Sequence, residues 1–339
     1  YSVVEGCGGS GSSWDSYFGT DGGSNLAVDP LFEDFYFNDF HLELGSDAIN
    51  AGDNTAAGLS PVDLDNDPRI YGGVIDIGAY ELVVDCPPGP VVYVDADAVG
   101  LDNGSSWADA YTEVRDALGA AKICGGGLGE IWVAEGTYRP TNGADRTASF
   151  RLANGVALYG GFDGTETARS ERDFAAHQSI LSGDVGAPIG NSDNSYHVVV
   201  ADGVDATAVL DGVWIRDSWG EEPGGGMLIL NGSPTLTNVT IANNTSGKGG
   251  GLYNDGGDPY LTNVHFYGNV VHSDYSRKGG GMYTVGGDPV LVNTVFSGNT
   301  SWDKGAGLYC ETGTVYVVNN SFSCGLADSA VALYLSLIH

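Results

Sequence analysis

The sequence predicts an all-β protein whose main part is a parallel β-helix, a solenoid of stacked coils, and three observations support this fold class. First, the segment KGGGLYNDGGDPYLTNVHFYGN at 248–269 returns as KGGGMYTVGGDPVLVNTVFSGN at 278–299. Second, glycine makes up 54 of 339 residues, against an ordinary share of roughly 7%, and follows no collagen period. Third, each period divides into three strand-like pieces that are too short, and too rich in Gly, Asn and Thr, for helical repeats.

Two columns of apolar residues advance through the repeat in step and mark the side chains expected inside the solenoid. Successive coils are 25 to 30 residues long. The first column is Leu210, Leu236, Leu261, Leu291 and Val317, and the second is Ile215, Ile241, Phe266, Phe296 and Phe322. One coil cannot bury its apolar side alone, so stacked coils are expected to share a continuous core.

An asparagine is expected to form a corner between the last two strands of each coil. Leu261 and Phe266 are five residues apart and could not share one face of an unbroken strand. A corner at Asn263 would turn both of them, and Val264, inward, and asparagine tolerates the left-handed conformation that such a corner needs. The equivalent residues are expected to stack as a ladder of side-chain amides: Asn238, Asn263, Asn293 and Asn319.

The motifs GG-x-[LM]-Y and F-x-x-N, present as VHFYGN and TVFSGN, carry a family resemblance. They resemble the repeats of polymorphic outer-membrane, adhesin-like bacterial surface proteins. More broadly, the chain is similar to the right-handed parallel β-helix, pectin-lyase-like superfamily. This resemblance implies a right-handed solenoid and an extracellular or cell-surface location.

The residues before the repeat predict a helix and a second module. Ala110, Val114, Ala117, Leu118 and Ala121 form one apolar helical stripe, with Ser105 or Ser106 as its N-cap. This helix is expected to cap the open end of the β-helix. The segment at 28–81, which ends in GGVIDIGAYE, resembles the end of a choice-of-anchor Q module. We therefore expect the end of an upstream module at 1–85, a Pro-rich linker at 86–90 and a second β-helix at 91–334. Within this β-helix, the cap and first coils are expected at 91–180 and the regular coils at 196–334. The last residues, 335–339, are expected to be a non-native tail.

The net charge and the cysteine content limit the classes of protein and of partner that fit this chain. The 13 Lys and Arg against 44 Asp and Glu give a net charge of −31, which disfavours nucleic acid and anionic lipid as partners. No apolar run approaches the roughly 18 residues of a membrane span. The chain opens on Tyr1, and we expect a fragment of a longer exported protein with flanking modules. The five cysteines lack metal-site spacing and predict either buried thiols or one or two disulfides.

An outward-facing stripe of tyrosines and lysines is the candidate glycan-binding face. Rings of this kind can stack on sugars, while Lys and Arg can bind carboxylate or sulfate groups. The alternative is that the tyrosines only cover the sheet. The candidate residues are Tyr253, Tyr283 and Tyr309 on the stripe, Lys248, Lys278 and Lys304 five residues before each tyrosine, and Trp219, Tyr275, Arg277 and Trp302 in the adjoining loops.

Two acidic segments are weak calcium candidates. DLDNDPR carries Asp63, Asp65 and Asp67 at alternating positions, but Pro68 replaces the required Gly and Val74 stands where a bidentate Glu belongs. The second segment, DADAVGLDNG, contributes Asp95, Asp97 and Asp102. No other cofactor is expected.

The motif inventory favours a non-catalytic surface protein that recognises polysaccharides or cell-surface glycans. The sequence contains no GxSxG and no HExxH motif. A polysaccharide lyase or glycoside hydrolase is the enzymatic alternative, for which Arg277 near Asp274 is the one base-like candidate. A purely structural stalk is the third alternative, since fold alone does not supply an activity.

Overall fold

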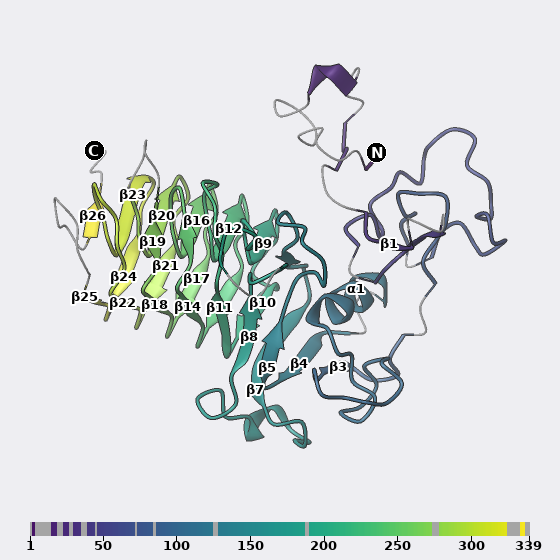
Figure 1. Cartoon of the computed structure of the whole chain (residues 1–339), viewed down its shortest axis with the longest axis horizontal. Coiled ribbons are helices and arrows are strands. Elements are labelled where there is room, and N and C mark those ends of the chain that lie inside the picture. Colours follow the sequence, from purple (N-terminus) through teal and green to yellow (C-terminus); the bar gives the residue numbers. More distant parts are fainter. Residues whose placement is uncertain are drawn as a thin grey trace.

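The computed structural model covers the whole chain, and placement is described for residues 2–3, 15–18, 23–26, 30–34, 39–44, 46–71, 73–83, 86–124, 128–186, 190–272, 278–323 and 333–335. Its main part is an all-β parallel solenoid, as predicted (Figure 1). Three sheets run along the solenoid, with eight, seven and seven strands. All pairings between their strands are parallel, and each strand pairs with its equivalents in the neighbouring coils.

The first sheet consists of β3 (Val91–Val94), β4 (Glu130–Ala134), β7 (Ala157–Phe162), β10 (Val209–Asp211), β13 (Thr235–Thr237), β17 (Tyr260–Thr262), β21 (Val290–Val292) and β24 (Tyr316–Val318). The second sheet consists of β5 (Gly136–Tyr138), β8 (Ser179–Ser182), β11 (Val213–Arg216), β14 (Thr240–Ala242), β18 (His265–Tyr267), β22 (Val295–Ser297) and β25 (Ser321–Ser323). The third sheet consists of β6 (Phe150–Arg151), β9 (Val199–Asp202), β12 (Met227–Leu230), β16 (Leu252–Asp255), β20 (Met282–Val285), β23 (Leu308–Thr312) and β26 (Leu333–Leu335). A short fourth ladder pairs β15 (Thr245–Ser246) with β19 (Val270–Val271).

The register of the sheets confirms both predicted apolar columns. In the first sheet Leu210 pairs with Leu236, and the column continues to Val317. In the second sheet the column from Ile215 to Phe322 is continuous. The ring of Phe296 stacks on those of Phe266 and Phe322, with centroid distances of 4.7 and 4.8 Å. Equivalent residues in successive coils therefore build one apolar core as far as Leu291 and Phe296, whereas Val317, expected inside, is 39% exposed in the last coils.

The predicted corner is confirmed. Asn263 has a φ of 55°, and Asn238, Asn293 and Asn319 have similar values of 54°, 52° and 56°. Leu261, Val264 and Phe266 are all buried, as the corner requires.

One α-helix is present among the described residues, α1 (Val114–Cys124), and it starts later than predicted. Ser106 does not cap it, because the Ser106 hydroxyl donates to Asp109 in the preceding loop, and Ser105 and Ala110 also lie before the helix. Val114, Ala117, Leu118 and Ala121 form its buried face, and they join the same core cluster as Val92 and Ile131 of the first strands. Figure 1 shows α1 beside β3 and β4 at the N-terminal end of the solenoid. Its role as a cap stays a prediction.

Part of the chain before the solenoid packs against α1. The chain before the solenoid includes a short 3-10 helix (Ser16–Phe18) and an antiparallel pair, β1 (Phe32–Asp34) and β2 (Asp39–Leu42). Leu42, Ala48 and Ile49 form a second apolar cluster with Ile123 of α1. A disulfide joins Cys86 to Cys124 at the end of α1, and Cys310 is a buried free thiol; Cys7 and Cys324 lie outside the described residues. The boundaries predicted at 85 and 91 stay predictions.

Within the described ranges, no helix has both the length and the apolar character that crossing a membrane requires.

Candidate functional site

The outward face of the third sheet brings the predicted tyrosines together in a ladder. Tyr253, Tyr283, Tyr309 and Tyr334 pair in register across β16, β20, β23 and β26. Their rings stack, with centroid distances of 5.2, 5.0 and 4.9 Å between successive members. Such aromatic pairs contribute about 0.5–1.5 kcal/mol each beyond their buried area.

Each predicted lysine covers the tyrosine of the next coil. The ammonium of Lys248 lies 5.4 Å from the centre of the Tyr283 ring, that of Lys278 lies 4.9 Å from Tyr309, and that of Lys304 lies 4.6 Å from Tyr334. A glycine with positive φ follows each lysine; at Gly249 (φ 58°) a Cβ would approach the carbonyl oxygen of Leu252 to 2.4 Å. The repeated Lys-Gly pair therefore turns the chain so that the lysine can reach the next ring.

The expectation of a stripe of exposed rings is wrong for the centre of the ladder. The exposed fractions of Tyr283 and Tyr309 are 1% and 5%. Ring faces that stack at coil spacing cover one another, and the ammonium groups of Lys248 and Lys278 lie over these two rings. A sugar therefore finds no free ring face at these two positions, while Tyr253 remains half-buried.

Electrostatic contacts fix the outer edge of the ladder. The Tyr283 hydroxyl donates a hydrogen bond to the Glu311 carboxylate, and the Lys278 ammonium donates to the Tyr309 hydroxyl over 3.3 Å. Burial lowers the pKa of Lys278, but the bond to Tyr309 and the carboxylates of Glu311 and Asp303 outweigh it and raise that pKa above its usual value. Burial also raises the pKa of the Tyr253 hydroxyl, as do nearby carboxylates. Lys278 thus stays charged.

Two of the predicted loop aromatics flank this face. Trp302 is 53% exposed, and Trp219 is half-buried, with its ring 5.6 Å from that of His272. The predicted residues Tyr275 and Arg277, together with Asp274, lie outside the described residues.

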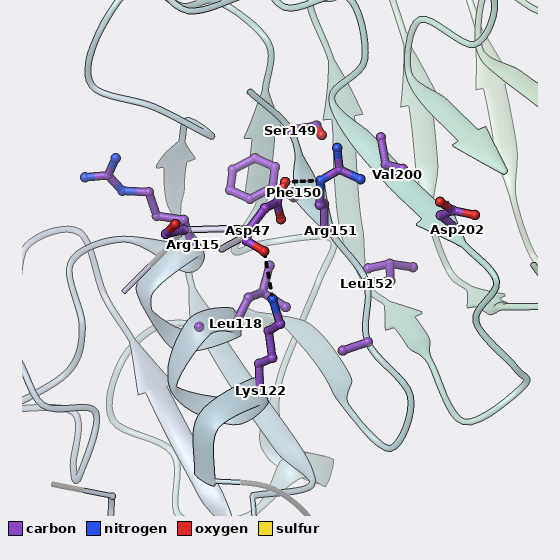
Figure 2. A pocket seen from close by; sticks show the side chains of 13 residues that line it. Asp47, Arg115, Leu118, Lys122, Ser149, Phe150, Arg151, Leu152, Val200 and Asp202 are labelled. Carbon is purple, nitrogen blue, oxygen red and sulfur yellow. Dashed lines mark hydrogen bonds and ion pairs between the residues drawn. The ribbon is translucent and has the colours of Figure 1, made fainter. Parts of the chain in front are cut away.

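The N-terminal end of the same face is hollowed. A pocket of about 290 Å³ lies between α1, residues 46–47 and strands β6 and β9 (Figure 2). Lys122 of α1 donates to the backbone carbonyl of Asp47 over 3.5 Å, and Arg151 of β6 forms an ion pair with the Asp47 carboxylate. Burial lowers the pKa of Lys122, against the opposing effect of the Asp47 and Asp76 carboxylates. No sequence motif indicated this pocket, because its walls come from segments far apart in the chain.

The predicted amide ladder is present at the corner on the opposite side of the coils from the third sheet. Asn238 donates to Asp211 over 2.8 Å, Asn263 donates to Asn238 over 3.1 Å, and Asn293 donates to Asn263 over 3.2 Å. For Asn319, the left-handed backbone is confirmed, but its bond to Asn293 stays a prediction.

Sequence reasoning missed a second, fully buried amide ladder. Asn269 accepts the backbone N–H of Asn244, donates to the carbonyl of Ile241 over 2.7 Å, and donates to the side chain of Asn299 over 3.0 Å. These three asparagines have zero exposure. The final Asn of the F-x-x-N motif was the available signal.

In the first calcium candidate, one carboxylate accepts several hydrogen bonds from the backbone. The buried Asp63 carboxylate accepts the N–H groups of Asp65, Asp67 and Glu81, each over 2.9 Å. Asp65 instead contacts His41 over 2.6 Å. These bonds form a turn around Asp63 and tie it to Glu81. Calcium binding here stays an untested hypothesis.

The second acidic segment is similar. Asp95 accepts the N–H of Asp97 over 3.0 Å, and Asp102 accepts that of Thr112 over 2.8 Å. Among the residues whose placement is described, no three His, Cys, Asp or Glu side chains gather in a geometry that could hold a metal ion.

Comparison with known proteins supports the repeat assignment. Residues 238–255 match the model of the Chlamydia polymorphic membrane protein repeat. The matched stretch runs from the corner Asn238 through Asn244 of the buried ladder to Lys248 and Tyr253, so it contains the residues that hold one coil to the next. No curated protein and no solved structure matches the chain. The repeat match and the parallel solenoid together fit a β-helix protein of the bacterial surface or outer membrane.

Proposed function

We propose that this chain is a non-catalytic, surface-displayed β-helix module that works as an adhesin-like binder of polysaccharides bearing carboxylate or sulfate groups. The observation that carries this proposal is the row of Lys248, Lys278 and Lys304, one per coil along the third sheet. Lys278 and Lys304 pair directly in parallel register. The backbones of Lys278 and Lys304 therefore lie about one strand spacing, roughly 4.8 Å, apart.

The row supports binding through the charge of the lysines in place of sugar stacking on the tyrosine rings. Tyrosine contacts hold each ammonium in place, so less side-chain entropy is lost when an anionic group binds. Trp302, exposed beside Lys304, offers an aromatic surface that is not part of the ladder. In a chain with 13 basic residues and a net charge of −31, a row of three lysines is a local exception that favours an anionic polymer along this face.

The test compares two triple variants with equal loss of charge. One is Lys248→Gln, Lys278→Gln and Lys304→Gln. The matched control is Arg139→Gln, Arg169→Gln and Arg216→Gln, whose arginines form exposed ion pairs away from the third sheet. Affinity for polygalacturonate and dextran sulfate should fall at least about tenfold in the lysine variant, because three charge-assisted contacts are lost. Neutral dextran serves as the uncharged probe.

Each other result rejects the proposal in a different way. Equal losses in the two variants would indicate non-specific charge attraction, and no binding by the unmodified chain would favour a structural stalk. Release of new reducing ends or unsaturated sugars would instead establish a lyase or hydrolase. Changing Tyr283 to Ser is unsuitable as a binding test, because this buried ring would be lost from the packing between coils.

A further inference from the structure

A continuous trough runs from α1 across the N-terminal strands of the third sheet. The pocket of Figure 2 and a neighbouring hollow of about 320 Å³ share Ser149, Arg151, Val200 and Asp202 as lining residues. The second hollow extends to Leu228 and Leu230 of β12. The trough is therefore one elongated feature, separate from the lysine row.

Its two ends differ in chemistry because of the sheet register. Arg151 pairs with Val200, Val200 pairs with Leu228, and Leu228 pairs with Tyr253, so these four side chains form one row across adjacent strands. A cation stands at one end of the row, and Val200, which is 5% exposed, and the half-buried Leu228 follow it, so Leu228 offers more apolar surface than Val200 does. Leu118 and Leu152 add apolar wall near the cationic end.

The cationic end of the trough has hydrogen-bond donors that its contacts with Asp47 do not use. The ion pair with Asp47 uses the Nε atom of Arg151, and Figure 2 shows both Nη atoms turned away from Asp47 towards Val200. Lys122 is half-buried, and its one hydrogen bond among the described residues is the long contact to the Asp47 carbonyl. The Ser149 hydroxyl lines the same pocket. A partly desolvated ammonium with one weak acceptor gains from a further anionic partner.

The other charged groups define where a ligand's anion can sit. Asp47 neutralises one side of Arg151, and the Arg115 guanidinium points away from the pocket towards Glu43, 3.4 Å distant. The exposed Asp202 lies on β9, beyond Val200 from Lys122, in register with Leu230. Asp47 already bridges Lys122 and Arg151, and the Asp76 carboxylate also acts on Lys122, so a further anionic group is favoured on the Nη side of Arg151 (Figure 2) and disfavoured farther along the trough.

We propose that this trough binds an amphiphilic monocarboxylate, with the carboxylate at the Nη atoms of Arg151, beside Ser149 and Lys122, and an aliphatic chain over Val200 and Leu228. Two strand steps separate Arg151 from Leu228, the far apolar wall of the trough, which is about 10 Å at the usual strand spacing. A chain of roughly eight to ten carbons spans this length. Burial of its methylenes, at about 0.8 kcal/mol each, supplies the affinity, and the cations supply the orientation.

The test titrates the full chain by calorimetry with four probes: octanoate, acetate, octanol and inorganic phosphate. Octanoate should bind saturably with one site per chain and at least about tenfold more tightly than any other probe, since only octanoate engages both ends. Equal binding of octanoate and acetate, equal binding of octanoate and octanol, or no saturable octanoate binding would each overturn the proposal.

Three single-residue variants test whether octanoate binds in this trough. Arg151→Gln should weaken octanoate about tenfold and leave octanol unchanged, and Leu228→Ser should weaken octanoate while leaving acetate unchanged. Asp202→Asn should strengthen octanoate binding, a gain that loss of structure would not produce. Arg169→Gln, an exposed arginine on another face, is the matched control. Octanoate affinity that is insensitive to all three trough variants would place binding elsewhere and reject the proposal.

Discussion

The Lys278 ammonium lies 4.9 Å from the centre of the Tyr309 ring, in the next coil, and donates a hydrogen bond to the hydroxyl of that ring. The same lysine-to-ring contact recurs from Lys248 to Tyr283 and from Lys304 to Tyr334. A residue of one coil thus covers an aromatic residue of the next, so the contact stabilises stacking whatever the face binds.

Replacing Lys278 with Met should lower the free energy of unfolding by about 1 kcal/mol, because a partly buried cation–π contact is lost. Lys278→Arg should retain most of the stability, since a guanidinium also binds a ring face. Urea unfolding of both variants measures the difference. Equal stability of the Met variant and the unmodified chain would show that the cation adds nothing to the ladder.

The buried asparagine ladder should matter more than the exposed one. Asn269→Ala leaves the Asn244 N–H and the Ile241 carbonyl without their partner, at about 1–3 kcal/mol for each buried group. Asn263→Gly keeps the left-handed backbone at the corner and should cost under about 1 kcal/mol. Thermal and urea unfolding compare the two, and a larger loss for Asn263→Gly would contradict the assignment of the inner ladder.

His41 should make the segment before the solenoid more stable at mildly acidic pH. Its Nε2 lies 2.6 Å from Asp65, its Nδ1 contacts Asp39, and these two carboxylates raise the pKa of His41 above 6.5. A raised pKa means that the folded state binds the proton more tightly. The resulting stability is fully present below about pH 6.5 and is lost as pH rises through the folded-state pKa.

The measurement is the difference in melting temperature between the unmodified chain and His41→Gln. This difference should be largest near about pH 5.5 and should shrink by about pH 8.5. A difference that stays constant across the range would show that His41 contributes through packing on Tyr80, 4.0 Å away, and not through charge.

The disulfide should hold the segment at 86–91 against α1. Cys86 and Cys124 are 38 residues apart, and the chain-entropy relation gives about 4 kcal/mol for a loop of that length. Cys86→Ser and Cys124→Ser should each lose about this much stability, and the double variant should lose no more than either single variant. Additive losses in urea unfolding would instead mean that the two sulfurs act independently.

Much of the solenoid was predictable because its determinants are local and repeated. The inward columns from Leu210 and Ile215 follow from side-chain alternation along each strand, and the corner at Asn263 follows from the parity between Leu261 and Phe266. The buried position of Asn269 was not predicted, since an isolated motif does not say whether its amide faces solvent or the neighbouring coil. The start of α1 was predicted too early, because Ser105, Ser106 and Ala110 match the pattern of a helix start. In the structure these three residues belong to the loop that precedes the helix.

By itself, the sequence determined the architecture of this protein. A repeat whose inward-facing positions are always apolar can bury its apolar side only by stacking one coil on the next. Only the tertiary structure decided which outward residues remain available. Tyr283 and Tyr309 face away from the core, yet the rings and lysines of adjacent coils cover them. Lys122, Arg151 and Val200 are distant in sequence, yet they line one trough. The exposure of an outward side chain depends on its neighbours in adjacent coils and in segments packed against the solenoid. These neighbours are set by three-dimensional contacts that no local sequence pattern encodes.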